Sequence, residues 1–360
     1  MRYFWLSVLF FFVLPVSGFA QRSVSPAPAA PLAEATDHTA VDRRISLDVV
    51  VTDKSGKPVA GLQQQEFTLL DDKQPKTITG FRAVNGTAEP DDPPMQAILL
   101  VDAVNTSFLS VSHQRQELEN FLRQDGGKLL MPTSLVFLTD KSTEIKPVPT
   151  RDGNALADSL KANASSLRVI GRSQGFYGAV DRAQISLRMV EGLTAYELTQ
   201  PGRKLLIWLS TGWPLLSGPN TYLSQKDQEG LFSTIVALSA TLRRARMTVY
   251  SIDPVGTADA GGLRTFYYET FLKGVKAAKS VQNGNLGLQV LAVQSGGLVL
   301  TSSNDIVSSM AKCVADGKAF YILSFDSPPA DNPNEYHNLQ IKIDKPGLTA
   351  RTRTGYYAQR

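Results

Sequence analysis

The stretch AILLVDAVNTSF, residues 97–108, joins an uninterrupted apolar run to a carboxylate, Asp102, and then to polar residues. Strands that are buried on both faces of a parallel sheet read as continuous apolar runs of this kind. Ligands of such sheets bind beyond the carboxyl ends of the strands. The stretch therefore predicts a buried strand that presents Asp102 at the binding edge of an α/β sheet.

Similar apolar runs recur along the chain and alternate with helical patterns. The runs are SLVFLTD (134–140), KLLIWLST (204–211), MTVYSID (247–253), LVLT (298–301) and AFYILSFDS (319–327). Helical patterns cover 113–124, 178–193, 229–245, 288–294 and 304–314, and the second is expected to end near Gly192. This alternation predicts an α/β fold with a mostly parallel, Rossmann-like sheet and helices on both faces. Asp102, Asp140, Thr211 and Asp253 are then expected at the carboxyl ends of the strands.

Segments on either side of this pattern have the two-residue period of antiparallel strands. In ISLDVVVTD (45–53) and HNLQIKI (337–343) apolar residues alternate with other residues, and turn-forming residues follow each segment. Each of these two segments has too few strands to be stable alone. We therefore expect residues 44–85 and 333–358 to form one small antiparallel β module beside an α/β domain at 95–327. A polar, proline-rich boundary at 85–94 separates the first part from the domain.

The amino-terminal residues predict export from the cytoplasm. Arg2 precedes the apolar run FWLSVLFFFVLPVSGFA, which has small residues at Gly18 and Ala20. This is typical of a signal peptide over residues 1–20, cleaved before Gln21, and an uncleaved anchor is the alternative. Residues 21–43 are rich in Pro, Ala, Ser and Thr and predict a flexible linker. No later run approaches the roughly 20 apolar residues of a membrane helix, so a secreted or periplasmic protein is expected.

Composition excludes several other classes. The net charge is only +4, from 37 basic and 33 acidic residues, without a basic block, so no nucleic-acid partner is expected. The single cysteine, Cys313, excludes an internal disulfide and zinc sites built on cysteine pairs, and its helical pattern predicts a buried thiol. The sequence contains no phosphate-binding glycine loop and no zinc-protease motif.

The ordered set of motifs resembles the von Willebrand factor A domain, and more closely the bacterial VWFA-related domain family of secreted proteins. The resemblance covers residues 44–358 and is carried by LDVVVTDKSGKPVAGLQQQEFTLLDD, AILLVDAVNT, KLLIWLSTG, VYSIDPVG, LQVLAVQSGGLVL and AFYILSFDSPP. The closing strands carry an Arg-x-Gly-Tyr-Tyr signature in Arg353, Gly355, Tyr356 and Tyr357. The resemblance implies an A-like fold and a binding or adhesion role.

It also implies a metal-ion-dependent adhesion site, which this sequence matches only in part. Asp102 stands at the first acidic position and Thr106 at the second hydroxyl position, but Val104 occupies the first hydroxyl position. The loop SQGFYG lacks the expected Thr, and Ser210 and Thr211 stand where a further Asp is expected. Missing charge and oxygen ligands weaken a magnesium site, so a degenerate site without a cofactor is expected. A weak Mg²⁺ site on Asp102 and Thr106, with Asn105 as a substitute ligand, is the alternative.

The interpretation we favour is a non-enzymatic module that binds an unidentified protein partner. The predicted contact surface surrounds the carboxyl ends of the strands, where the aromatic residue of GWPLL adds a contact or a lid. It consists of Asp102, Asn105, Thr106, Thr211 and Trp213. An insertion at residues 254–287 carries four crowded aromatic residues, which either pack on the core or form a second contact patch: Phe266, Tyr267, Tyr268 and Phe271.

One motif favours a different class. GRSQG, residues 171–175, fits the G-x-S-x-G pattern of a nucleophile elbow and precedes a helix, so Ser173 is an alternative catalytic nucleophile. A serine hydrolase also needs a histidine base, and only His337 follows, within the β tail. An oxyanion stretch such as HGGG is missing from the sequence.

Overall fold

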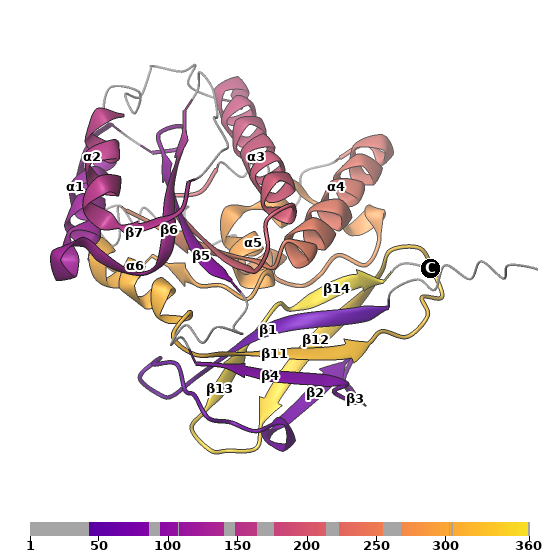
Figure 1. The fold of residues 1–360 in the computed structure, drawn as a ribbon. Coiled ribbons are helices and arrows are strands. Elements are labelled where there is room, and N and C mark those ends of the chain that lie inside the picture. The colour runs from indigo at the N-terminus through magenta and orange to yellow at the C-terminus, as the bar shows by residue number, and fades with distance from the viewer. Residues whose placement is uncertain are drawn as a thin grey trace, which may run out of the picture. The chain divides into compact units, whose positions relative to one another are not determined.

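Five of the continuous apolar runs form a six-stranded sheet with one short edge strand in the computed structural model (Figure 1). The model describes residues 43–85, 94–106, 108–139, 148–163, 176–213, 223–254, 268–301, 303 and 305–358. The predicted signal peptide, all but the last residue of the predicted linker, and the GRSQG loop lie outside the described residues. From Asp42 onward the chain forms one compact unit.

The central sheet has the order β10-β9-β8-β5-β6-β7, in which only the edge strand β7 runs antiparallel to its neighbour. The strands are β5 (Met95–Asp102), β6 (Lys128–Leu138), β7 (Thr150–Asp152), β8 (Arg203–Leu209), β9 (Met247–Ile252) and β10 (Val299–Leu300). In chain order this is the 3-2-1-4-5-6 arrangement of doubly wound sheets. It confirms the predicted A-like α/β fold class.

Helices cover both faces of the sheet, which explains why β5 is continuously apolar from Ala97 to Val101. Ala97, Leu99 and Val101 face α1 (Phe108–Leu122), α2 (Gly153–Ala162) and α6 (Ile306–Ala315). Ile98 and Leu100 face α3 (Phe176–Leu198), α4 (Gln225–Arg244) and α5 (Leu288–Gln294). Successive strand residues point to opposite faces, so each face takes alternate residues of β5.

Two helical features differ from the predictions. Helix α3 continues through Gly192 to Leu198, because Met189, Val190 and Leu193 pack into the core and outweigh the low helix propensity of glycine. Helix α2 was not predicted. The carboxylate of Asp152 caps its first turn and accepts the Ala155 N–H at 3.0 Å.

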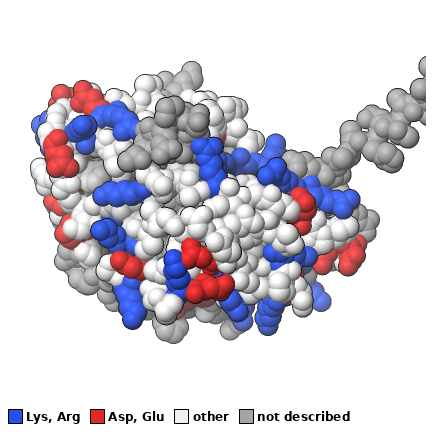
Figure 2. Space-filling view, turned by 60° about the horizontal axis from the view of Figure 1, so that its bottom comes forward, with Lys and Arg blue, Asp and Glu red and all other residues white. Residues whose placement is uncertain are grey.

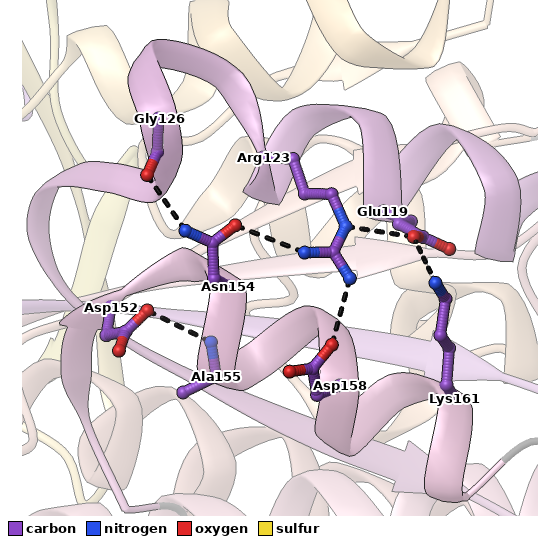
Figure 3. Close-up of polar contacts among 8 residues, drawn as sticks. All are labelled: Glu119, Arg123, Gly126, Asp152, Asn154, Ala155, Asp158 and Lys161. Carbon is purple, nitrogen blue, oxygen red and sulfur yellow. Dashed lines mark hydrogen bonds and ion pairs between the residues drawn. The ribbon is translucent and has the colours of Figure 1, made fainter.

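Helices α1 and α2 are joined by a cluster of polar side chains on the surface (Figure 3). Arg123, directly after α1, pairs with Glu119 of α1 and with Asp158 of α2, both at 2.9 Å. Lys161 of α2 reaches Glu119 at 2.8 Å, and Asn154 accepts a hydrogen bond from Arg123 at 3.1 Å. Glu119 of α1 therefore pairs with Arg123 and with Lys161 of α2, and it holds the two helices together at the surface.

Two four-stranded antiparallel sheets pack face to face and form the β module. Their orders are β13-β1-β11-β4 and β14-β12-β2-β3. The strands are β1 (Arg44–Thr52), β2 (Phe67–Asp71), β3 (Gln74–Lys76), β4 (Gly80–Val84), β11 (Phe320–Asp326), β12 (Glu335–Ile343), β13 (Thr349–Arg351) and β14 (Gly355–Ala358). Leu47, Leu323, Leu69 and Ile341 meet in the core between the sheets. The amino- and carboxyl-terminal strands thus share one module, as predicted.

The strand β11 corrects the predicted domain range 95–327. That range grouped AFYILSFDS with the α/β sheet, but β11 pairs antiparallel with β1 and β4 of the β module. Both faces of β11 are covered, by the module core at Leu323 and by Val50 and Val84 beside Phe320. A strand whose two faces are both covered has the same continuous apolar sequence as a buried parallel strand.

Ion pairs and a tyrosine join the β module to the α/β domain. The guanidinium group of Arg351 pairs with Asp316, whose carboxylate also accepts the Tyr250 hydroxyl at 2.6 Å. Arg246, which follows α4, pairs with Asp48 of β1.

The described part of the insertion packs on the core through short helices, with Phe271 only 6% exposed. These helices are η3 (Tyr268–Phe271), η4 (Ala278–Ser280) and η5 (Asn283–Leu286), besides η1 (Gln64–Glu66) and η2 (Gln124–Gly127) elsewhere.

The Cys313 side chain is fully buried on α6, as predicted, and this burial raises the pKa of its thiol far above the ordinary value. Among the described residues, no helix is both long enough and apolar enough to cross a membrane. Phe266 and Tyr267 of the predicted aromatic patch lie outside the described residues.

Candidate functional site: the carboxyl edge of the central sheet

Asp102 lies at the last position of β5, beside the end of β8. The chain order of the strands reverses between β5 and β8, so this is the switch point of the sheet. Doubly wound folds bind ligands at such points, because the loops leave in opposite directions and open a crevice. The strand that the sequence identified therefore ends at the position with the greatest potential for binding.

The carboxylate of Asp102 is completely buried and accepts five hydrogen bonds. Oδ1 accepts the backbone N–H groups of Val104 and Asn105, both at 2.9 Å. Oδ2 accepts Asn105 Nδ2 at 2.7 Å, the Ser210 hydroxyl at 2.7 Å and Trp208 Nε1 at 3.1 Å. A carboxylate offers about four lone-pair positions, so these donors saturate it.

The residues around Asp102 hold the two neighbouring loops together. Asn105 Nδ2 also contacts the Ser186 hydroxyl of α3 at 2.8 Å. The Thr211 hydroxyl donates to the Asn105 carbonyl oxygen at 3.1 Å, so the loop after β8 is bonded to the loop after β5. Ser210 Oγ, which donates to Asp102, accepts the Gly212 N–H at 3.0 Å. The result is a closed network of hydrogen bonds.

Glycine is required where the β8 loop turns. Gly212 has a φ of +83°, and a Cβ atom there would lie 2.7 Å from Nε2 of the Gln289 side-chain amide. The same amide donates to the Thr211 carbonyl oxygen at 3.2 Å. The left-handed backbone of Gly212 thus lets α5 approach the loop.

Two tryptophans lie beneath the network. The rings of Trp208 and Trp213 meet edge to face, with their centroids 5.3 Å apart. Trp213 Nε1 donates to the Leu286 carbonyl oxygen at 2.9 Å, and the side chain is only 5% exposed. The sequence offered Trp213 as an exposed contact or a lid. The structure instead places it in the core, because its donor finds a backbone partner in the insertion.

The side chains at this edge do not fit a magnesium centre well. Magnesium prefers oxygen ligands in an octahedral arrangement, but Oδ2 of Asp102 is enclosed by N–H and O–H donors, and Val104 offers no oxygen. Two buried oxygen atoms, Asn105 Oδ1 and Thr106 Oγ1, have no hydrogen-bond partner. They could contribute ligands, but both are neutral, and the carboxylate of Asp102 in the same loop is already saturated.

The structure brings most of the predicted site residues together but leaves few of them accessible. Asp102 is fully buried and Thr106 is 3% exposed, whereas Asn105 and Thr211 are half-buried. Asp140 lies outside the described residues. Neither the contact of Ser186 nor the donor role of Trp208 was predicted from the sequence. A tryptophan inside an otherwise aliphatic strand is the only signal that could have indicated the latter.

Only one residue of the alternative catalytic site, His337, lies within the described residues. Ser173 lies outside the described residues. His337, its only downstream histidine, is buried in the β module, where Nδ1 lies 3.0 Å from Asp71 Oδ1 and the ring stacks on Tyr356. The Tyr356 hydroxyl donates to Asp71 Oδ2 at 3.0 Å, so this carboxylate is held from two sides. In this arrangement His337 links three strands of one sheet.

Comparisons with known proteins found similarity only among solved structures. No protein-family model matches the sequence, and no curated protein sequence matches it. An aerotolerance-related membrane protein from Bacteroides fragilis is 9% identical with a TM-score of 0.32, over 61% of this chain and 98% of that protein. The pilus adhesin SpaC from Lactobacillus rhamnosus GG is 10% identical with a TM-score of 0.37, over 84% of this chain and 49% of SpaC. The VWA domain of SpRpn10 is 14% identical with a TM-score of 0.27, over 61% of this chain and 94% of that domain. No function is transferred from these proteins.

Proposed function

We propose that this chain is a secreted or periplasmic module that binds a protein partner through the carboxyl edge of its central sheet, without a metal ion. One observation carries the proposal. The carboxylate of Asp102, which would anchor a metal, accepts five hydrogen bonds from its own loop and from β8. An edge that is rigid without a metal can contact a partner by shape and hydrogen bonding alone.

Within this proposal the predicted residues have two different roles. Asp102, Thr106 and Trp213 are buried and fix the loops. Asn105 and Thr211 are half-buried, belong to the two bonded loops and contact the partner. Loops that are held before binding lose less entropy on association, which favours affinity.

A photo-crosslinking residue placed at position 211 tests the contact surface in cells that produce the protein. The matched control carries the same residue at Lys318, an exposed side chain near the amino end of the sheet. We expect a protein adduct from position 211 only, unchanged in EDTA and abolished by Asn105→Arg. An adduct that EDTA abolishes, or equal adducts from both positions, would contradict the proposal.

The alternative function is a serine hydrolase that uses Ser173. A fluorophosphonate probe distinguishes the two classes, because it labels an activated serine and not an ordinary hydroxyl. Labelling of the wild-type chain but not of Ser173→Ala would replace the binding proposal with the hydrolase. Equal absence of labelling in both chains is what the binding proposal expects.

A further inference from the structure

The hairpin from β12 to β14 opens in its middle. The first part of β12, from Glu335 to Asn338, pairs with β14. From Leu339 to Ile343, β12 pairs only with β2, because the returning chain crosses to the other sheet, where β13 pairs with β1. A groove of about 590 Å³ lies between the separated strands, and we call it the hairpin groove. Its lining comes from residues 339–343 and 348–352, with Thr354, Val293 and Gly297.

Both sides of the hairpin groove are strand edges. Backbone groups of successive strand residues point to opposite edges of the strand. The Asn338 carbonyl accepts from Asp72 of the turn after β2 at 2.8 Å, and the Leu339 N–H donates away from β2 to Thr354 at 2.9 Å. Ile341 and Ile343 therefore direct their N–H and C=O groups into the groove. Within the described part of the chain, no strand pairs with this side of β12 or with the outer side of β13.

The side chains define what kind of strand would fit. Leu339 and Ile341 are buried and face the module core, whereas Gln340 and Lys342 face solvent. Side chains of neighbouring strands share the same faces, so an added strand would place alternate residues over apolar and over polar surface. It would therefore need apolar side chains at every second position.

The charge of the groove indicates which residues the added strand should carry between its apolar positions. Lys342 and Arg351 are the only charged residues that line the groove, and both are basic. Arg351 is paired with Asp316, whereas Lys342 is exposed and has no ion pair among the described residues. The β module at the bottom of Figure 1 comes forward in Figure 2, where basic and acidic side chains are interspersed over the visible face. The charge preference of the groove therefore rests on Lys342, and an acidic residue beside it would be complementary.

We propose that the hairpin groove binds an extended segment of a partner protein as an added β-strand, with apolar residues alternating with acidic ones. Addition of a strand to an exposed edge obtains affinity from backbone hydrogen bonds and specificity from alternate side chains. The free backbone groups of β12 belong to Ile341 and Ile343, and β13 is three residues long. The groove therefore suits a short segment of about five residues at roughly 3.4 Å per residue. This site is separate from the carboxyl edge of the central sheet and does not depend on the function proposed for that edge.

Capped seven-residue peptides of alternating valine and glutamate test the proposal. The probes are this acidic peptide, a lysine counterpart, and an acidic peptide with N-methylated backbone. We expect the acidic peptide to bind best, as measured by calorimetry with the chain of residues 21–360. N-methylation should weaken binding by about tenfold, because it removes backbone donors. Lys342→Glu should weaken it about two- to fivefold, whereas Lys226→Glu on α4 should not.

Amide hydrogen exchange gives a readout at the site itself. In the free protein the amides of Ile341 and Ile343 should exchange faster than those of Gln340 and Lys342, which belong to the ladder with β2. The acidic peptide should slow exchange at Ile341 and Ile343 specifically. Binding that ignores peptide charge and N-methylation, the absence of binding, or slow exchange at these two amides through dimerisation without peptide would each overturn the proposal.

Discussion

Trp208 Nε1 donates a hydrogen bond to Oδ2 of Asp102 across 3.1 Å, from the strand next to the one that Asp102 ends. A fully buried indole thus occupies a carboxylate position that a metal ion would need. The Ser210 hydroxyl approaches the same oxygen at 2.7 Å. The edge of the sheet is therefore closed by side chains of β5 and β8 and their loops.

Removal of the Asp102 carboxylate should destabilise the chain strongly. In Asp102→Ala the indole of Trp208 and the amide of Asn105 lose a buried acceptor, and each unsatisfied buried group costs about 1–3 kcal/mol. We expect a loss of about 3 kcal/mol or more in the free energy of unfolding, measured with urea. Glu191→Ala, which removes an exposed carboxylate from α3, should change it by less than about 0.5 kcal/mol. Similar effects of the two substitutions would contradict the network.

The bond between Trp208 and Asp102 should appear as an energetic coupling. In a double-mutant cycle, Trp208→Phe and Asp102→Asn should deviate from additivity by about 0.5–3 kcal/mol, as contacting residues do. The matched cycle with Trp213→Phe should be additive within about 0.5 kcal/mol, because Trp213 donates to Leu286 instead. Equal coupling in both cycles would show that packing of the two rings, and not the hydrogen bond, links these positions.

The pair between Arg351 and Asp316 should contribute to the attachment of the β module. Asp316 is only 3% exposed, so Arg351→Met leaves a buried carboxylate held by Tyr250 alone. Breaking a buried pair costs about 3–5 kcal/mol. Arg246→Met breaks a more exposed pair with Asp48 and should destabilise less. Urea unfolding that ranks the two variants in the opposite order would contradict this assignment.

Glu119 should stabilise the chain in a pH-dependent way. Its hydrogen bonds to Lys161 and Arg123 lower the pKa of its carboxyl group below the usual 4.5. The stabilisation is therefore present above about pH 4.5 and is lost as the pH falls through the lower folded-state pKa. Glu119→Gln should lower the free energy of unfolding by about 0.5 kcal/mol at pH 7, and the difference should shrink in acid. A difference that persists unchanged in strong acid would contradict this origin, and Glu191→Gln is the control.

The sequence predicted the architecture well because burial on two faces leaves a direct trace in the residues. β5, β8 and β9 are mostly apolar, and the flanking strands alternate, so the α/β sheet and the β module could both be predicted. The assignment of β11 failed because the sandwich core covers one face of FYILSFD and the cluster around Phe320 covers the other, and burial of both faces produces the same apolar run. The short strand β7 and helix α2 carry too little pattern to be recognised.

The places of the predicted residues in the sheet could be read from the sequence, but their contacts could not. Asp102 and Thr211 could be placed at one edge from their positions at strand ends. Whether a side chain at that edge is exposed depends on contacts between distant segments, such as Trp213 with Leu286. Ser186, which accepts a hydrogen bond from Asn105, and Trp208, which donates one to Asp102, reach the edge from α3 and from within β8. No spacing in the sequence indicates the direction of either side chain.

The central claim is that the Asp102 edge is complete without a metal ion, and thermal unfolding tests it most directly. The chain of residues 21–360 is dialysed against EDTA, and its Tm is then followed as Mg²⁺, Mn²⁺ or Ca²⁺ is added at constant ionic strength. A cation that binds only the native state adds about 2.7 kcal/mol at a hundred times its Kd, which raises the Tm. Our account predicts no rise with any of the three cations. A saturable rise with one of them in the millimolar range, absent from Asp102→Asn, would contradict it.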